Sequence, residues 1–294
     1  MRFEYLFAEF GTLYGDAANM SYLHRAVPDA EIVKTRHTDC PAFVDSHVDF
    51  VYIGSLTEAA QELAIAALLP HRESLERYIN RGGVFLATGN SLEIFGEYIQ
   101  NIEDRKQDKK WDEKWDREQN REQNEKRRIP GLGLFSIHAE RDMINRYNSL
   151  FLGKFFEEFP EAFPEGFPEA FPRKTESLDT VKFKSLDISG SKSLDIVGFK
   201  SQFGHCRGDN GEGLFTTTRG AGLNPDVVPE GLRRNNFMAT YLLGPLLVLN
   251  PPFTKYLLGL LGYPNATLPF EAATMDLYKA RVREFSDPKR GFTY

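Results

Sequence analysis

The chain of 294 residues carries 36 Lys and Arg against 42 Asp and Glu, and its net charge of −6 argues against a general electrostatic role on nucleic acid. Hydrophobic residues make up 41% of the sequence, which can fill a sizeable core, so we expect one domain over residues 1–294. No stretch reaches the ~20 apolar residues of a membrane span, and the N-terminal run contains two glutamates, so the sequence predicts a cytoplasmic protein without membrane insertion.

Strand-like and helix-like segments alternate along the first hundred residues. Asp16 is placed to cap the first predicted helix. The predicted strands cover 3–10, 31–35, 48–53 and 84–88, and two further helices cover 57–69 and 72–80. This alternation is typical of an α/β fold in which helices cross over a mostly parallel sheet.

Two repetitive inserts interrupt this pattern. Residues 105–128 are nearly all charged or amide-bearing and contain tandem four-residue repeats, which favours a solvated helix. Residues 157–194 contain Phe-Pro at every fourth position and then an eight-residue repeat. Frequent proline excludes a regular helix, and short repeats of this kind favour a disordered surface loop.

Strand signals resume after the second insert. They cover 195–200, 213–218 and 237–241, and two helical segments follow, one introduced by residues 250–252 and one over 271–285. The second half of the chain therefore continues the α/β pattern.

The cysteines and histidines show no spacing that is typical of a metal or cofactor site. Cys40 and Cys206 lie far apart without a CxxC motif, so we expect unpaired thiols. His205 and Cys206 are adjacent, but neighbouring strand residues point to opposite faces, which argues against a catalytic pair. The other histidines are scattered without an HxH or HExxH spacing, and we predict neither a metal nor a cofactor.

Six motifs along the chain carry a family resemblance. They are Leu13-Tyr-Gly-Asp-Ala-Ala-Asn19, Phe50-Val-Tyr-Ile-Gly54, the predicted buried strand, sharp turn and helix over residues 83–96 around Gly89, Pro130-Gly-Leu-Gly-Leu134, Ile196-Val-Gly-Phe199, and Glu230-Gly-Leu-Arg233 with Thr240-Tyr-Leu-Leu-Gly-Pro-Leu-Leu247. In this order they resemble the CobB/CobQ-like class I glutamine amidotransferase domain, most closely the glutaminase subunit of bacterial lipid II isoglutaminyl synthase. The resemblance covers most of residues 3–262 once the inserts are removed.

The resemblance implies an α/β fold of the class I glutamine amidotransferase type, a flavodoxin-like three-layer sandwich with a mostly parallel central sheet. In that family a cysteine thiolate attacks the side-chain amide of glutamine, a histidine moves the proton, and backbone amides hold the oxyanion. The ammonia passes to an ATP-dependent ligase of the Mur-ligase type, which amidates a cell-wall precursor.

This chain departs from the family at both catalytic positions. Gly89 stands where the family has its nucleophile, and Leu243 stands where it has its histidine. The family's glycine-rich oxyanion loop corresponds to Gly54, Ser55 and Leu56, which has gained side chains. The residual cleft candidates are Gly54, Ser55, Asn90, Ser91 and Glu93.

Three functions remain open. The first is an inactive amidotransferase-like protein that acts by binding, with a Mur-ligase-like enzyme as its expected partner. The second is an active amidotransferase with relocated groups, but a hydroxyl at Thr88 or Ser91 is a poor substitute for a thiol without an adjacent base. The third is a small-molecule sensor that uses Asn90, Ser91 and Glu93 in the residual cleft.

Overall fold

The structure is a computed structural model, and it describes residues 1–102, 128–156 and 193–293. The predicted charged helix at 105–128 and the predicted disordered insert at 157–194 therefore lie almost wholly outside the described residues. Within the described ranges, none of the helices combines the length and the apolar character that crossing a membrane requires.

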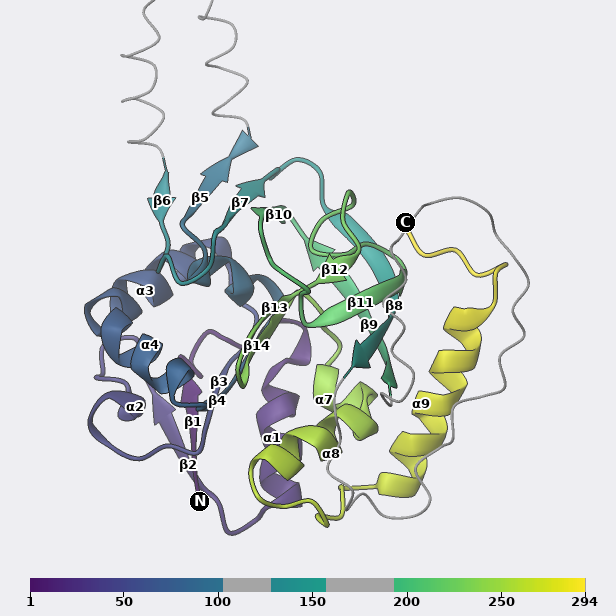
Figure 1. The fold of residues 1–294 in the computed structure, drawn as a ribbon, viewed down its shortest axis with the longest axis horizontal. Helices are drawn as coiled ribbons and strands as arrows, with labels where there is room; N and C mark the ends of the chain where they lie inside the picture. Colours follow the sequence, from purple (N-terminus) through teal and green to yellow (C-terminus); the bar gives the residue numbers. More distant parts are fainter. Residues whose placement is uncertain (103–127, 157–192, 294) are drawn as a thin grey trace, which may run out of the picture.

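A six-stranded sheet forms the centre of the molecule (Figure 1). Its strands run in the order β13-β14-β4-β3-β1-β2, and every neighbouring pair is parallel except β13 with β14. This confirms the predicted mostly parallel central sheet. The strands are β1 (Arg2–Leu6), β2 (Glu31–Thr35), β3 (Phe50–Ile53), β4 (Val84–Thr88), β13 (Leu232–Arg234) and β14 (Phe237–Thr240).

Helices pack on both faces of this sheet because its inner strands carry apolar side chains on both sides. The core on the side of α3 and α4 contains Val51, Ile53 and Phe85, and the core on the side of α1 and α8 contains Tyr52 and Leu86. The helices and 3₁₀ segments are η1 (Leu13–Gly15), α1 (Ala17–Ala26), α2 (Ala42–Asp45), α3 (Glu58–Leu68), η2 (Leu69–His71), α4 (Arg72–Asn80), η3 (Gly89–Phe95), α7 (Leu246–Leu249), α8 (Pro251–Leu260) and α9 (Glu271–Ser286).

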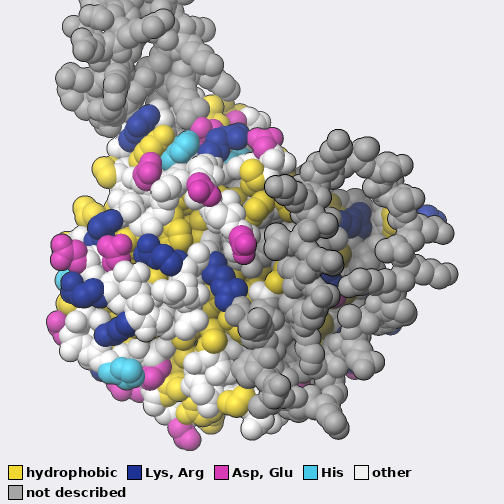
Figure 2. Space-filling model, in the orientation of Figure 1, with side chains coloured by type: hydrophobic (Ala, Val, Ile, Leu, Met, Phe, Trp, Pro, Cys, Tyr) yellow, Lys and Arg dark blue, Asp and Glu magenta, His cyan; other side chains and the backbone are white. Residues whose placement is uncertain are grey.

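Two four-stranded sheets, which the sequence pattern did not separate from the first, complete the described fold. One has the order β10-β7-β5-β6 and the other β12-β11-β8-β9. Their strands are β5 (Tyr98–Asn101), β6 (Ile129–Pro130), β7 (Ile137–Arg141), β8 (Tyr147–Phe156), β9 (Ser193–Gln202), β10 (Gly204–Gly208), β11 (Phe215–Arg219) and β12 (Pro229–Glu230). Figure 2 shows side chains of both charge signs interspersed over the face that it presents.

Both undescribed segments join strands that pair with each other. In β5 and β6, Ile99 lies opposite Ile129 in an antiparallel ladder. In β8 and β9, Phe156 lies opposite Ser193. Because Ser193 and Leu194 belong to β9, the predicted end of the second insert at residue 194 is two residues too late.

Three local predictions are wrong for identifiable reasons. The first strand ends at Leu6 rather than Phe10, because Phe7 adopts a φ of 55° and the chain turns there. The side chain of Asp16 makes no capping hydrogen bond to α1, since it binds neighbouring loops instead. The segment after β4 is the 3₁₀ segment η3 rather than an α-helix.

Candidate functional site

The turn after β4, here called the elbow, has Gly89 at its apex and therefore carries no side chain there. Gly89 has a φ of +67°, a left-handed conformation that glycine adopts at little cost. A Cβ at this position would lie 2.5 Å from Ser55 Oγ, 2.6 Å from Ser55 Cβ and 3.0 Å from Leu243 Cδ2. The volume that a nucleophilic side chain would need is therefore filled by Ser55 and Leu243.

Leu243, which the resemblance aligns with a histidine, is fully packed. Its side chain is buried, and its backbone N–H donates to Phe199 O over 2.9 Å, which ties the end of the central sheet to β9. A leucine here supplies packing and no proton acceptor.

The backbone amides of the loop after β3 already have acceptors inside the protein. The Ser55 N–H donates to the Asp16 carboxylate over 2.9 Å. The Leu56 N–H donates to Asn90 Oδ1 over 2.8 Å, and Asn90 Nδ2 donates to Leu56 O over 2.8 Å. Asn90 therefore closes this loop from both sides and occupies donors that an oxyanion would need.

Asp16 is a buried carboxyl that joins three segments. It accepts hydrogen bonds from the Ser55 N–H and from Thr88 Oγ1, the latter over 2.7 Å, and Asn19 Nδ2 lies 3.4 Å away. Burial raises the pKa of Asp16 to about 6, although these hydrogen bonds favour the charged form.

Neither predicted hydroxyl is placed to act as a relocated nucleophile. Ser91 Oγ donates to Thr88 O over 2.8 Å, and Thr88 Oγ1 donates to Asp16; both side chains are buried. Cys206 is also buried, and burial followed by the negative charge of Glu93 raises the pKa of its thiol well above the usual range. A protonated thiol without solvent contact is a poor nucleophile.

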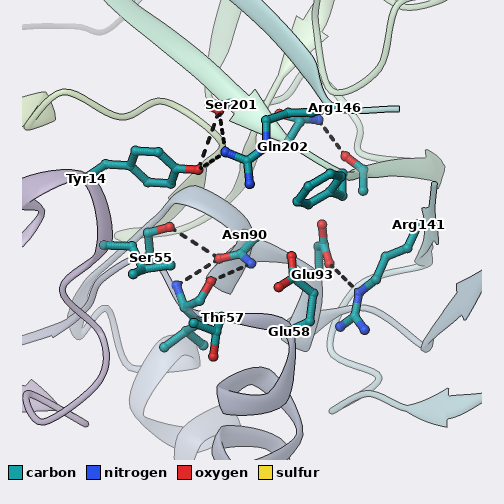
Figure 3. Close-up of a pocket in the computed structure, with 14 residues that line it drawn as sticks. Tyr14, Ser55, Thr57, Glu58, Asn90, Glu93, Arg141, Arg146, Ser201 and Gln202 are labelled. Atoms are coloured by element: carbon teal, nitrogen blue, oxygen red, sulfur yellow. Dashed lines mark hydrogen bonds and ion pairs between the residues drawn. The ribbon is translucent and has the colours of Figure 1, made fainter. Parts of the chain in front are cut away.

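A cavity of about 150 Å³ lies beside the elbow (Figure 3). Of the five cleft candidates, Ser55, Asn90 and Glu93 line it, whereas Gly54 and Ser91 are not among its lining residues. Sequence reasoning missed its other polar lining residues, which come from η1, α3, β7 and the segments around β8 and β9. They are Tyr14, Thr57, Glu58, Arg141, Arg146, Ser201 and Gln202.

Glu93 is the buried acid of this cavity. Gln61 Nε2 donates to Glu93 Oε2 over 2.9 Å, Tyr241 Oη donates to Oε1 over 3.1 Å, and Arg141 Nε lies 3.9 Å from Oε2. Burial raises the pKa of Glu93, and the positive charge of Arg141 counteracts this. Figure 3 shows Tyr14 and Arg141 on opposite sides, with Asn90 and Glu93 between them.

Arg146 forms another part of the cavity wall, beside Tyr14. Its Nη1 donates to Tyr14 Oη over 2.8 Å, and its guanidinium stacks over the Phe203 ring at 4.3 Å. Tyr14 has a φ of 57° and is 41% exposed, so a left-handed, partly exposed tyrosine holds the arginine in place. The cavity thus presents one buried acid and two guanidinium groups. Among the described residues, no group of three or more His, Cys, Asp or Glu side chains is placed to hold a metal ion.

A scan against protein-family models finds no match for this sequence, and a comparison with curated proteins finds none either. Among solved structures, the chain is similar to PurLQS from Thermotoga maritima, with 11% identity over 82% of this chain and 85% of that chain, and a TM-score of 0.44. A structure described as a glutamine amidotransferase has 12% identity over 88% of this chain and 98% of that chain, with a TM-score of 0.44. A glutamine amidotransferase from Thermotoga maritima has 10% identity over 97% of this chain and 91% of that chain, with a TM-score of 0.42. All three scores fall in the range in which two structures need not share a family.

The packing around position 89 predicts the effect of adding a single carbon there. Gly89→Ala should lower the free energy of unfolding by about 2–3 kcal/mol, because the methyl group meets Ser55 and Leu243 in a left-handed conformation. Gly15→Ala is the matched control, since Gly15 has a φ of +78° and open space around its missing Cβ. Urea denaturation should give a loss of only about 1 kcal/mol for the control. In the double variant, Ser55→Gly should recover part of the stability that Gly89→Ala loses, because it removes the side chain that the new methyl group meets. Equal losses for Gly89→Ala and Gly15→Ala would contradict close packing around Gly89.

The raised pKa of Asp16 predicts a stability that depends on pH. The pKa is higher in the folded chain than the ordinary aspartate value of 3.8, so folding takes up a proton between about pH 4 and pH 6. The contribution of Asp16 to stability is therefore most favourable below pH 4 and falls as the pH rises through 6. Relative to wild type, Asp16→Asn should gain up to about 3 kcal/mol of unfolding free energy between pH 4 and pH 7. Denaturant titrations across this range measure the difference, and a constant difference would refute the shift.

Proposed function

We propose that this chain is a glutamine amidotransferase-like protein of the CobB/CobQ type that has lost catalysis and acts by binding. The observation that carries the proposal is the occupied apex, where Ser55 and Leu243 fill the space that a side chain at Gly89 would take. Further support comes from the Ser55 and Leu56 amides, which are bound to Asp16 and Asn90 and are withdrawn from any reacting group.

The expected partner is an ATP-dependent ligase of the Mur-ligase type that amidates a cell-wall precursor. This part of the proposal follows from the motifs around Gly89 and from 240–247, which resemble the glutaminase subunit of lipid II isoglutaminyl synthase. In such a pair the chain supplies a binding surface, and ammonia reaches the ligase from another source.

A glutaminase assay of the purified chain, alone and together with a ligase encoded beside it, tests this proposal. We expect no glutamate release above the uncatalysed rate in either case, and we expect the two proteins to co-elute in size-exclusion chromatography. Ser91→Ala and Cys206→Ala serve as controls and should not change the result. Glutamate release that either substitution abolishes would reject the proposal in favour of a relocated nucleophile, and separate elution would reject the ligase partner.

A second candidate function, sensing of a small molecule, is favoured by the cavity of about 150 Å³ beside the elbow. Arg146 and Arg141 can hold a carboxylate, and Glu58 and Glu93 can hold an amino group. The cavity is close in size to one that accommodates a benzene-sized molecule, so an amino acid is the upper limit.

Calorimetric titration with glutamine and with glutamate tests the sensor candidate. If it holds, one of them binds at millimolar concentration or below, and Arg146→Ala weakens that binding about tenfold by removing one charge-assisted contact. Arg77→Ala, an exposed arginine of α4 outside the cavity, is the matched control. Absence of heat with both ligands would leave the interaction proposal and reject the sensor.

A further inference from the structure

A second cavity, of about 290 Å³, lies between the β8–β9 pair and the C-terminal half of α9. Its wall is largely apolar and is formed by Leu150, Val197, Phe199, Leu249 and Phe285. Leu150 and Phe199 are direct cross-strand partners in β8 and β9, so their side chains share the sheet face that α9 covers. The cavity is separate from the elbow and from its polar neighbour.

Buried hydrogen bonds fix the sheet side of this cavity. Asn250 Oδ1 accepts from the Val197 N–H and Asn250 Nδ2 donates to Val197 O, both over 2.8 Å. Gly244, which lines the cavity, has a φ of +125°, and a Cβ there would lie 2.7 Å from Leu249 Cδ1. The hollow is therefore bounded by a backbone that is held in place.

The helix side is fixed by one arginine. Arg219 donates to the carbonyl oxygens of Phe285, Asp287 and Arg290 at 2.6, 2.6 and 2.7 Å, and its guanidinium stacks over the Phe292 ring at 4.1 Å. These contacts hold the end of α9 and the following turn against the sheet. The cavity is thus pre-formed rather than dependent on an induced rearrangement.

Two guanidinium groups line the rim. Arg281 Nη1 lies 2.7 Å from Glu284 Oε2, and Arg290 Nη2 lies 3.4 Å from Glu284 Oε1. One carboxylate therefore orients both arginines and leaves one net positive charge among these three groups. Arg281 is 52% exposed and Arg290 is 46% exposed, so both side chains remain accessible to an incoming anion.

We propose that this cavity binds a medium-chain aliphatic carboxylate. The hydrocarbon chain packs against the apolar wall, and the carboxylate pairs with Arg281 and Arg290 at the rim. The volume of about 290 Å³ is near the lower end of small-molecule pockets and suits a chain of roughly eight to ten carbons. The surplus positive charge selects an acid over the corresponding alcohol. This site is independent of the proposed function of the elbow.

Calorimetric titration of the full chain with octanoate, below its micelle-forming concentration, tests the proposal against 1-octanol as the uncharged ligand. We expect octanoate to bind at one site and 1-octanol to bind about tenfold more weakly, because the alcohol lacks the charge-assisted contact. Arg281→Ala and Arg290→Ala should each weaken octanoate binding without changing 1-octanol binding. Arg77→Ala, an exposed arginine of α4, should change neither.

Leu249→Trp fills the cavity and should abolish binding of both ligands, with circular dichroism reporting whether the variant is folded. If that variant does not fold, Val197→Phe provides the same test from the opposite wall. Three outcomes overturn the proposal: no binding of octanoate, equal affinity for octanoate and 1-octanol, or octanoate binding that survives the filling of the cavity in a folded variant. Concentration-dependent dimers that octanoate fails to disrupt would assign the hollow to a second copy of the chain instead.

Discussion

The arrangement of the elbow depends on one buried carboxyl, that of Asp16. Its Oδ2 accepts from both the Ser55 N–H after β3 and the Thr88 hydroxyl at the end of β4, so two strand ends and the start of α1 are held around a single group. The position of Ser55 follows from this contact, and the position of Ser55 in turn leaves no room for a side chain at residue 89. Burying the Asp16 carboxyl costs desolvation free energy, but its hydrogen bonds fix the position of the loop after β3.

Side chains and hydrogen bonds from three segments fill the surroundings of Gly89. Ser55 occupies the space above Gly89, Leu243 closes the space beside it, and Asn90 takes the hydrogen bonds of the loop. Together these side chains surround the apex of the turn with satisfied polar groups and apolar contacts. The polar cavity next to them is bounded by arginine and glutamate side chains.

The local sequence pattern predicted those elements whose formation depends on the burial and capping of residues that are close in the sequence. The strand Val84–Thr88 and the helix Arg72–Asn80 have the predicted bounds, and Thr57 caps α3 through its side chain. The hydrogen bonds of Asp16 to Ser55 and Thr88 were not predictable in this way. A carboxylate uses the same oxygen atoms to cap a helix and to accept from distant residues, and which of the two occurs depends on the folded positions of the loops. Arg141 and Arg146 carried no local signal for the same reason, since β7 and β8 reach the elbow only through tertiary packing.

The pairing of the strands that flank the two repetitive segments has an evolutionary consequence. Ile99 faces Ile129 and Phe156 faces Ser193, so each segment leaves and re-enters the sheets at neighbouring points. For a loop whose ends are fixed together, doubling the length costs only about 0.6 kcal/mol in closure entropy. Whole repeats can therefore be duplicated or deleted by replication errors without shifting the register of either ladder. A change in the number of repeats thus leaves the pairing of the flanking strands, and the core beneath them, as they are.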